Sequence, residues 1–406
     1  MKMQRFLSSS IICILLSASL QSATVKQELK FYDSLRDIVQ LPENEQVSRL
    51  EENILNLPDF HPAYLKYLER LYKFDQIQRG LQFFNKPHHF NPCFQNWMLG
   101  RLYDYVGQTD AAAVHFQDAL TCSEPPYEML RDIVKFADRE NEKELHHLLN
   151  HNTLPDPLKF SLFAFQAQNK GRFQKAVRYF NRVGMSHLSS TALYDYGAAL
   201  FKVNDMQAAK NAFLRMKQCS EQVGDSYHLS EAFIGLSCIA FEESGPIGFL
   251  ELNEKAVKAG EQTDAMFPLC MAQNNLGIVY LNQDKYNLAK PYLEKAATGF
   301  VALHEYRRAL KTYTKLGNVQ SGLYNYTKCL AYYEKAREIA GKQNDALEYA
   351  KLILEKAELF DRMHAFHLAY KYYSEALNIA RENQYADLTL QLNIVPAGSG
   401  NESGQL

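Results

Sequence analysis

The sequence predicts an all-α protein built as a solenoid of antiparallel helix pairs. Ala296, Ala336 and Ala376 lie 40 residues apart, and Gly277 and Gly317 keep the same step. A fixed period of this length is typical of a chain that stacks one supersecondary unit repeatedly. The 406 residues include only 19 glycines and 13 prolines, too few turn-formers for an all-β fold, while 47% are hydrophobic and can fill a core.

Residues 1–23 are expected to be a signal peptide rather than part of the fold. Lys2 and Arg5 precede an apolar stretch at 11–16, and small residues follow at 17–19. This order is typical of a secretory signal, and the apolar stretch is too short to span a bilayer comfortably. An uncleaved N-terminal anchor is the alternative. We therefore expect a protein exported to the periplasm or the extracellular space, with no membrane span in the mature chain.

Residues 24–58 are expected to form helices that cap the repeat array. Apolar residues recur at helical spacing before Pro42, and again between Pro42 and Pro58. The two sets are Leu29, Tyr32, Leu35, Ile38 and Val39, then Val47, Leu50, Ile54 and Leu57. The exposed face of a first repeat needs such cover.

The repeat unit combines small residues, where two helix backbones approach closely, with large residues that fill the remaining space. In one copy the small residues are Gly277, Ala289 and Ala296, and the large ones are Leu276, Tyr280 and Leu293. This combination predicts two antiparallel helices joined near residues 282–285.

The pattern resembles the tetratricopeptide repeat (TPR), with Leu-Gly and Tyr on its first helix and Ala-x3-Phe on its second. One good copy comprises Leu99, Gly100, Tyr103, Ala112, Phe116, Ala119 and Pro125, and further copies contain Gly197, Gly317 and Ala376. The resemblance implies a TPR-like array over residues 59–388, a TPR-type α-solenoid wound as a right-handed superhelix of antiparallel helix pairs. Because the TPR unit has about 34 residues, the longer step implies longer helices or connections and a deeper groove.

Some segments depart from this pattern. The Ser-Gly-Pro sequence at 244–246 is expected to disturb the start of the second helix in the unit that contains Gly235. Residues 62–84 are expected to form only a short helix pair. The C-terminal residues 389–406, which end in a Gly- and Ser-rich stretch, are expected to be a flexible tail.

Six cysteines follow the predicted signal peptide: Cys93, Cys122, Cys219, Cys238, Cys270 and Cys329. An even number of cysteines in an exported chain permits disulfide bonds. Their wide and irregular spacing nevertheless favours buried free thiols. If any two are bonded, Cys219 and Cys238 are the most reasonable pair, because they lie on neighbouring helices of the stack.

No motif supports catalysis, a cofactor or a metal site, so we expect no enzyme activity. The sequence lacks a Gly-rich phosphate loop, a G-x-S-x-G motif and the kinase motifs. His147 and His151 lie one helical turn apart near Glu144, but an H-E-x-x-H motif and a third ligand are missing, which favours a polar helix face. The same interpretation applies to His364 and His367. A net charge of -2 without a long basic run gives no electrostatic reason to expect nucleic-acid binding.

The first helix of each TPR lines the concave face, and helical geometry relative to the repeat glycine selects positions on that face. The selected polar residues are Asn274, Asn275, Lys311, Lys315, Asn318 and Lys351. These residue types resemble the TPR carboxylate clamp, although their order along the repeats differs from it. One hypothesis is that lysine ammonium groups pair with a peptide carboxylate while Asn amides bind peptide backbone. The alternative is a solvated lysine face.

The matching face of the earlier repeats contains Phe94, Trp97, Tyr194 and Phe201. These aromatic side chains either grip apolar groups of a partner or pack under the adjacent helix, and the second interpretation is favoured.

The predicted function is an exported TPR scaffold that binds a protein or an extended peptide in its concave groove. A ligand- or peptide-sensing TPR regulator is the main alternative. A hydrolase hidden within a helical array is a third class, without positive support from any motif.

Overall fold

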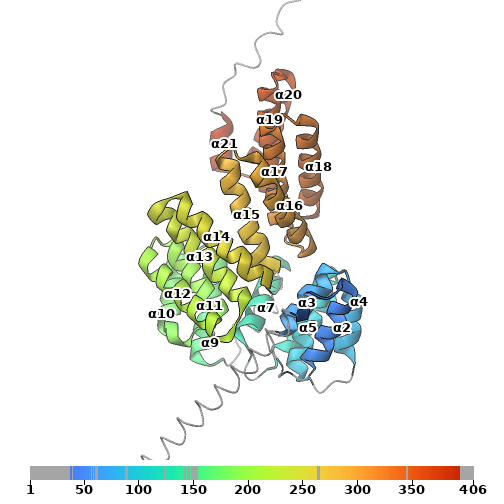
Figure 1. Ribbon diagram of the computed structural model, residues 1–406, viewed down its shortest axis with the longest axis vertical. Coiled ribbons are helices and arrows are strands. Elements are labelled where there is room, and N and C mark those ends of the chain that lie inside the picture. The colour runs from blue at the N-terminus through green and yellow to red at the C-terminus, as the bar shows by residue number, and fades with distance from the viewer. Residues whose placement is uncertain are drawn as a thin grey trace, which may run out of the picture. The chain divides into compact units, whose positions relative to one another are not determined.

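The computed structural model confirms the all-α solenoid, in which successive helices are arranged as antiparallel pairs (Figure 1). The structure describes residues 37–393 except 39, 56, 58, 60–62, 87–89, 123–124, 141–142, 144–146, 148–153, 263–265 and 344–345. The predicted signal peptide at 1–23 lies outside the described residues. Within them, no helix is both long and apolar enough to cross a membrane.

The chain divides into two compact units, unit 1 up to Pro268 and unit 2 from Leu269. In chain order the helices are α2 (Glu43–Ile54), α3 (Ala63–Lys73), α4 (Ile77–Asn85), α5 (Pro92–Tyr105), α6 (Thr109–Ala119), α7 (Tyr127–Glu140), α9 (Asp156–Asn169), α10 (Phe173–Val183), the 3-10 helix η1 (Met185–His187), α11 (Ser190–Lys202), α12 (Met206–Val223), α13 (Ser226–Ser244), α14 (Pro246–Gln262), α15 (Met266–Asn282), α16 (Tyr286–Ala302), α17 (Tyr306–Gly322), α18 (Tyr326–Gln343), α19 (Ala346–Arg362), α20 (Phe366–Glu382) and α21 (Ala386–Asn393). Figure 1 shows α17, α18, α19 and α20 of unit 2 side by side.

A glycine on the first helix of a pair faces a large side chain placed 16 residues later on the second helix. A Cβ added at any of these glycines would lie within 2.8 Å of that side chain. The pairs are Gly100 with Phe116, Gly197 with Phe213, Gly277 with Leu293 and Gly317 with Tyr333. The glycines therefore form notches that let the two helices approach, as the repeat pattern predicts.

Two boundaries differ from the sequence prediction. The predicted tail at 389–406 begins too early, because α21 continues to Asn393 and buries Leu388 and Leu392 against its neighbours. The Ser-Gly-Pro segment at 244–246 does not disturb the second helix. Gly245 connects the helices with φ of 75°, and Pro246 opens α14, where its missing N–H is not needed.

The 40-residue step of unit 2 consists of two 20-residue halves. The helices α15, α16, α17, α19 and α20 have 17 residues each and are followed by a three-residue turn whose middle residue has a positive φ, while α18 has 18 residues. These residues are Asp284, His304, Tyr324, His364 and Gln384, with φ between 55° and 58°. The next N–H donates to the carbonyl five residues earlier, at 2.8–2.9 Å, which closes a Schellman turn without glycine.

Replacing Tyr324 by glycine is expected to stabilise unit 2 by about 1 kcal/mol. A left-handed backbone conformation costs a residue with a Cβ roughly 1–2 kcal/mol, and glycine avoids this cost. Glycine loses more backbone entropy on folding than other residues, so only part of that free energy is gained. Tyr324 is 80% exposed, so little packing is lost. Tyr324→Ala is the control, because it removes the ring and keeps the Cβ. Equal stability of the two variants by circular dichroism in urea would contradict the prediction.

The inner helices of unit 1 are held together by buried polar contacts. Asp195 on α11 accepts hydrogen bonds from Tyr127 and Arg131 on α7. His228 on α13 pairs with Asp225; burial lowers the pKa of His228, but the Asp225 charge and hydrogen bond raise it to about 9. Oppositely charged side chains of the protein thus compensate Asp195 and His228 in unit 1.

Candidate functional site

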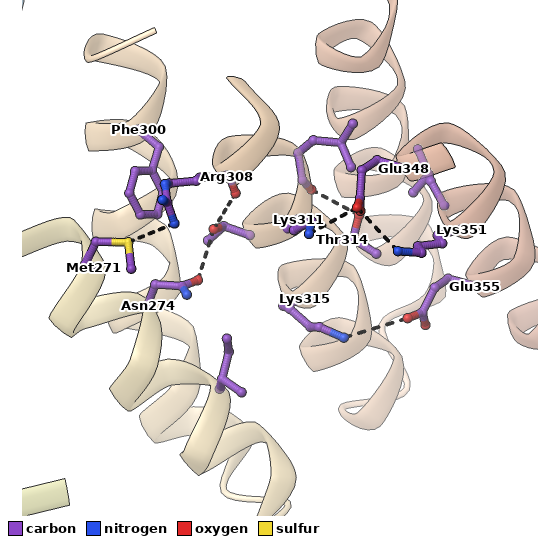
Figure 2. Close-up of a pocket in the computed structure, with 14 residues that line it drawn as sticks. Met271, Asn274, Phe300, Arg308, Lys311, Thr314, Lys315, Glu348, Lys351 and Glu355 are labelled. Carbon is purple, nitrogen blue, oxygen red and sulfur yellow. Dashed lines mark hydrogen bonds and ion pairs between the residues drawn. The ribbon is translucent and has the colours of Figure 1, made fainter. Parts of the chain in front are cut away.

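A pocket of about 300 Å³ lies within unit 2 between α15, α17 and α19, the first helices of three successive pairs (Figure 2). Its volume is at the lower end of the range typical of ligand sites, about 300–1,000 Å³. Phe300, Leu310 and Leu352 contribute an apolar floor that is shared with the core. Charged and amide side chains form the rest of the wall.

Glu348 is the centre of the charged wall. Its side chain is only 4% exposed, and its Oε1 lies 3.0 Å from Lys311 Nζ, 3.4 Å from Lys351 Nζ and 3.5 Å from an Arg307 nitrogen. Figure 2 shows Lys311 and Lys351 reaching this carboxylate from α17 and α19. The three cations compensate a carboxylate that would otherwise be costly to bury.

A second acidic residue, Glu355, lies seven residues after Glu348, two turns further along α19. Its carboxylate accepts a 2.9 Å hydrogen bond from the Asn318 amide and is 3.8 Å from Lys315 Nζ. The Asn318 carbonyl accepts a 2.5 Å hydrogen bond from the Tyr333 phenol. Burial raises the pKa of Tyr333 well above its usual value, so the phenol remains protonated and donates.

The other end of the pocket is formed by α15 and the start of α17. Asn274 Oδ1 lies 3.0 Å from the Thr312 hydroxyl, which is also 2.8 Å from the Arg308 carbonyl oxygen. The Arg308 guanidinium contacts the sulfur of Met271 at 3.2 Å and lies 3.4 Å from Glu305. Amide, hydroxyl, guanidinium and thioether groups therefore meet at this end.

The pocket brings together Asn274, Lys311, Lys315 and Lys351 of the six predicted residues. Asn318 stands beside it and supports Glu355. Asn275 is half-buried on α15 and is not part of the lining. The solvated lysine face is therefore an incomplete description, because the lysines form ion pairs within the protein.

Sequence reasoning missed the acidic half of the site, Glu348 and Glu355. The spacing of Glu348, Lys351 and Glu355 places them on one face of α19. This spacing can be read from the sequence. The pairing of Glu348 with Lys311 and of Glu355 with Lys315 follows only from the packing of α19 against α17.

Basic groups outnumber acidic groups in the lining of the pocket. The basic lining residues are Arg308, Lys311, Lys315 and Lys351, and the acidic ones are Glu348 and Glu355. Four against two leaves an excess of two positive charges. An ammonium group has three N–H donors, and a pair with one carboxylate oxygen uses one of them. The wall can therefore accept a further anionic group.

The aromatic residues of the earlier repeats belong to the core. Phe94 and Trp97 are almost fully buried, and Tyr194 and Phe201 pack against the same cluster. The Trp97 indole N–H donates to Asp132 at 3.1 Å. This confirms packing under adjacent helices as their role.

The pairs of His147 with His151 and of His364 with His367 are expected to be polar helix faces rather than metal sites. Glu144 and His151 lie outside the described residues. Among the residues that are described, no group of three His, Cys, Asp or Glu side chains could hold a metal ion.

Residues 268–342 match the family model of the tetratricopeptide repeat. Among proteins of curated function, none matches this sequence.

The chain is also similar to several solved structures. The Signal Transduction ATPase with Numerous Domains (STAND) protein with a tetratricopeptide repeat sensor from Pyrococcus horikoshii matches with a TM-score of 0.52 at 15% identity, covering 86% of this chain and 55% of that one. The APC/C hetero-tetramer Cut9–Hcn1 matches with a TM-score of 0.50 at 12% identity, covering 86% and 73%. A Rap protein complexed with competence and sporulation factor matches with a TM-score of 0.45 at 12% identity, covering 80% and 92%. At these identities the first two matches show the α-solenoid fold alone, so a function has to be argued from the residues of this chain.

Proposed function

We propose that this TPR-type solenoid is an exported scaffold that binds an extended acidic segment of a peptide or protein in the pocket of α15, α17 and α19. The observation that carries the proposal is the pocket's excess of positive charge above an apolar floor. The ammonium groups bind carboxylates of the ligand, and the partly buried side chains of Met271 and Ile278 contact an apolar side chain beside them. Export rests on the N-terminal charge and apolar pattern alone.

Glu348 gives the site a built-in competitor for the ligand. Its carboxylate already pairs with the cations that the ligand needs. A single carboxylate on the ligand would gain little binding free energy, because Lys311 and Lys351 would have to share their N–H donors between it and Glu348. A segment with two or more acidic groups can reach the lysines on both sides of Glu348, so we expect a preference for such segments.

Charge reversal of Lys311 and Lys315 is expected to weaken binding of an acidic peptide by about tenfold or more. Each reversed charge in a partly exposed contact contributes on the order of 1 kcal/mol. The measurement is fluorescence anisotropy of a labelled octapeptide with two glutamates beside a leucine. Its counterpart with glutamines reports the part of the affinity that does not depend on charge.

Two further variants distinguish the pocket from the overall charge. Lys295→Glu with Lys328→Glu gives the same change in net charge at exposed positions of α16 and α18, outside the pocket lining, and is expected to leave the affinity nearly unchanged. Glu348→Gln is expected to strengthen binding about threefold, because it removes the internal competitor. Equal losses in both double variants, or no strengthening by Glu348→Gln, would contradict the proposed site.

A further inference from the structure

Two cysteines of unit 1 meet at one end of the α5–α6 pair. Cys93 is the second residue of α5, and Cys122 is the third residue after the end of α6. Because the two helices are antiparallel and pack together, the start of α5 lies beside the end of α6. Both side chains are buried in the same core cluster.

The contacts of the two thiols place them within reach of each other. Cys93 Sγ lies 3.6 Å from the hydroxyl of Thr121, the residue next to Cys122. Burial, and after it the neighbouring Cys93 thiol, raises the pKa of Cys122 to about 12. Because Cys93 Sγ contacts the residue that precedes Cys122 and both cysteines lie in one core cluster, a small movement of the side chains can bring the two sulfur atoms into bonding distance.

The neighbours named for Cys238, Cys329 and Cys270 are residues other than cysteine. Burial raises the pKa of Cys238, whose neighbours include Ser237 and Lys202. Burial also raises the pKa of Cys329, which lies beside Tyr333. Cys270 packs against Gly299. Cys219 on α12 and Cys238 on α13, which from the sequence are the most reasonable pair if any two cysteines are bonded, are both half-buried.

We propose that Cys93 and Cys122 form an intramolecular disulfide bond when the protein meets a disulfide oxidant. The thiolate of one cysteine attacks a sulfur of the oxidant, which forms a mixed disulfide and releases one thiolate of the oxidant. The thiolate of the second cysteine then attacks the mixed disulfide at the protein sulfur and releases the other half. The protein loses two protons and two electrons, and the oxidant is reduced to two thiols.

The bond ties the beginning of α5 to the end of α6, so it restricts the unfolded chain between them. The raised pKa of Cys122 leaves little thiolate at neutral pH, so oxidation of the folded protein is expected to be slow and to accelerate with rising pH. Such a bond persists in an oxidising compartment, which is the kind of environment expected for an exported chain.

The experiment compares the full chain after incubation with oxidised glutathione and after incubation with a thiol reductant. Peptide mapping by mass spectrometry without reduction is expected to yield one linked pair containing Cys93 and Cys122. Alkylation under unfolding conditions is expected to label two fewer thiols in the oxidised sample. The melting midpoint is expected to rise by about 5 °C on oxidation.

Matched variants make the result decisive. Cys93→Ser and Cys122→Ser are each expected to abolish the linked peptide and the rise in melting midpoint. Cys219→Ser with Cys238→Ser is expected to keep both. Circular dichroism of the reduced variants reports whether each one folds. A linked Cys219–Cys238 peptide in place of the proposed one, or glutathione bound separately at Cys93 or Cys122 without a link, would overturn the inference.

Discussion

Replacing Asp195 by alanine is expected to destabilise unit 1 by about 3 kcal/mol. Asp195 is only 3% exposed, and its carboxylate accepts hydrogen bonds from the Tyr127 phenol at 2.9 Å and from Arg131 at 3.1 Å. Removing it leaves a buried phenol without its acceptor and a mostly buried guanidinium without its counter-ion. The Arg131 side chain is about one-fifth exposed, so water compensates part of the loss.

A double-variant cycle isolates the ion pair from other effects of the substitution. Arg131→Met and Asp195→Leu are each expected to be costly, because each leaves one charge unpaired. The combined variant is expected to lose clearly less than the sum of the two, because apolar groups of similar volume can replace a buried pair.

The fluorescence of Trp97 in urea is a suitable measurement, because this buried side chain is the only tryptophan of the chain and lies in unit 1. Additive losses in the cycle would show that Arg131 and Asp195 do not stabilise the protein as a pair.

Replacing Gly317 by alanine is expected to destabilise unit 2 by about 2 kcal/mol. The added Cβ would lie 2.2 Å from a ring carbon of Tyr333, closer than such contacts allow. Tyr333 is almost fully buried and donates a hydrogen bond to Asn318, so its ring cannot move away freely. Overpacking of this kind typically costs about 1–3 kcal/mol, which outweighs the gain from the higher helix propensity of alanine.

Gly341 provides the matched control on the neighbouring helix α18. It is exposed, and nothing lies within 4 Å of a Cβ added there. Gly341→Ala is therefore expected to stabilise unit 2 by about 0.5–1 kcal/mol. Circular dichroism during thermal unfolding follows both variants. A stabilising effect at Gly317 would contradict the interpretation of this glycine as a helix-packing notch.

The notch at Gly317 also shows what could be predicted from the sequence. Small and large residues recur at fixed spacing because each helix pair must solve the same packing problem. The offset from Gly277 to Leu293 is the same as that from Gly317 to Tyr333, and it follows from helix length and turn length alone. The fold class and most of the helix pairs could therefore be predicted from the sequence.

Two element boundaries could not be predicted as well from the sequence. Leu388 and Leu392 belong to a helix that buries them, although Gly and Ser soon afterwards suggested a tail. Gly245 and Pro246 suggested a break in the second helix, but they form the connection before it begins. In both cases residue type indicated a turn or a tail. The boundary depended on the burial of Leu388 and Leu392 in the first case, and on the backbone at Gly245 and Pro246 in the second.

The candidate site, too, could be predicted only in part from the sequence. Helical spacing placed Lys311 and Lys315 on the inner face of α17, because that spacing is a local property of one helix. Their pairing with Glu348 and Glu355 depends on how α19 packs against α17, since charges 30 to 40 residues apart in the chain meet only in the folded solenoid. The sequence by itself determined the repeated helix pair and the face that each first helix presents. Only the tertiary structure decided that the lysines face carboxylates of the same chain, because electrostatic pairing depends on distance in space.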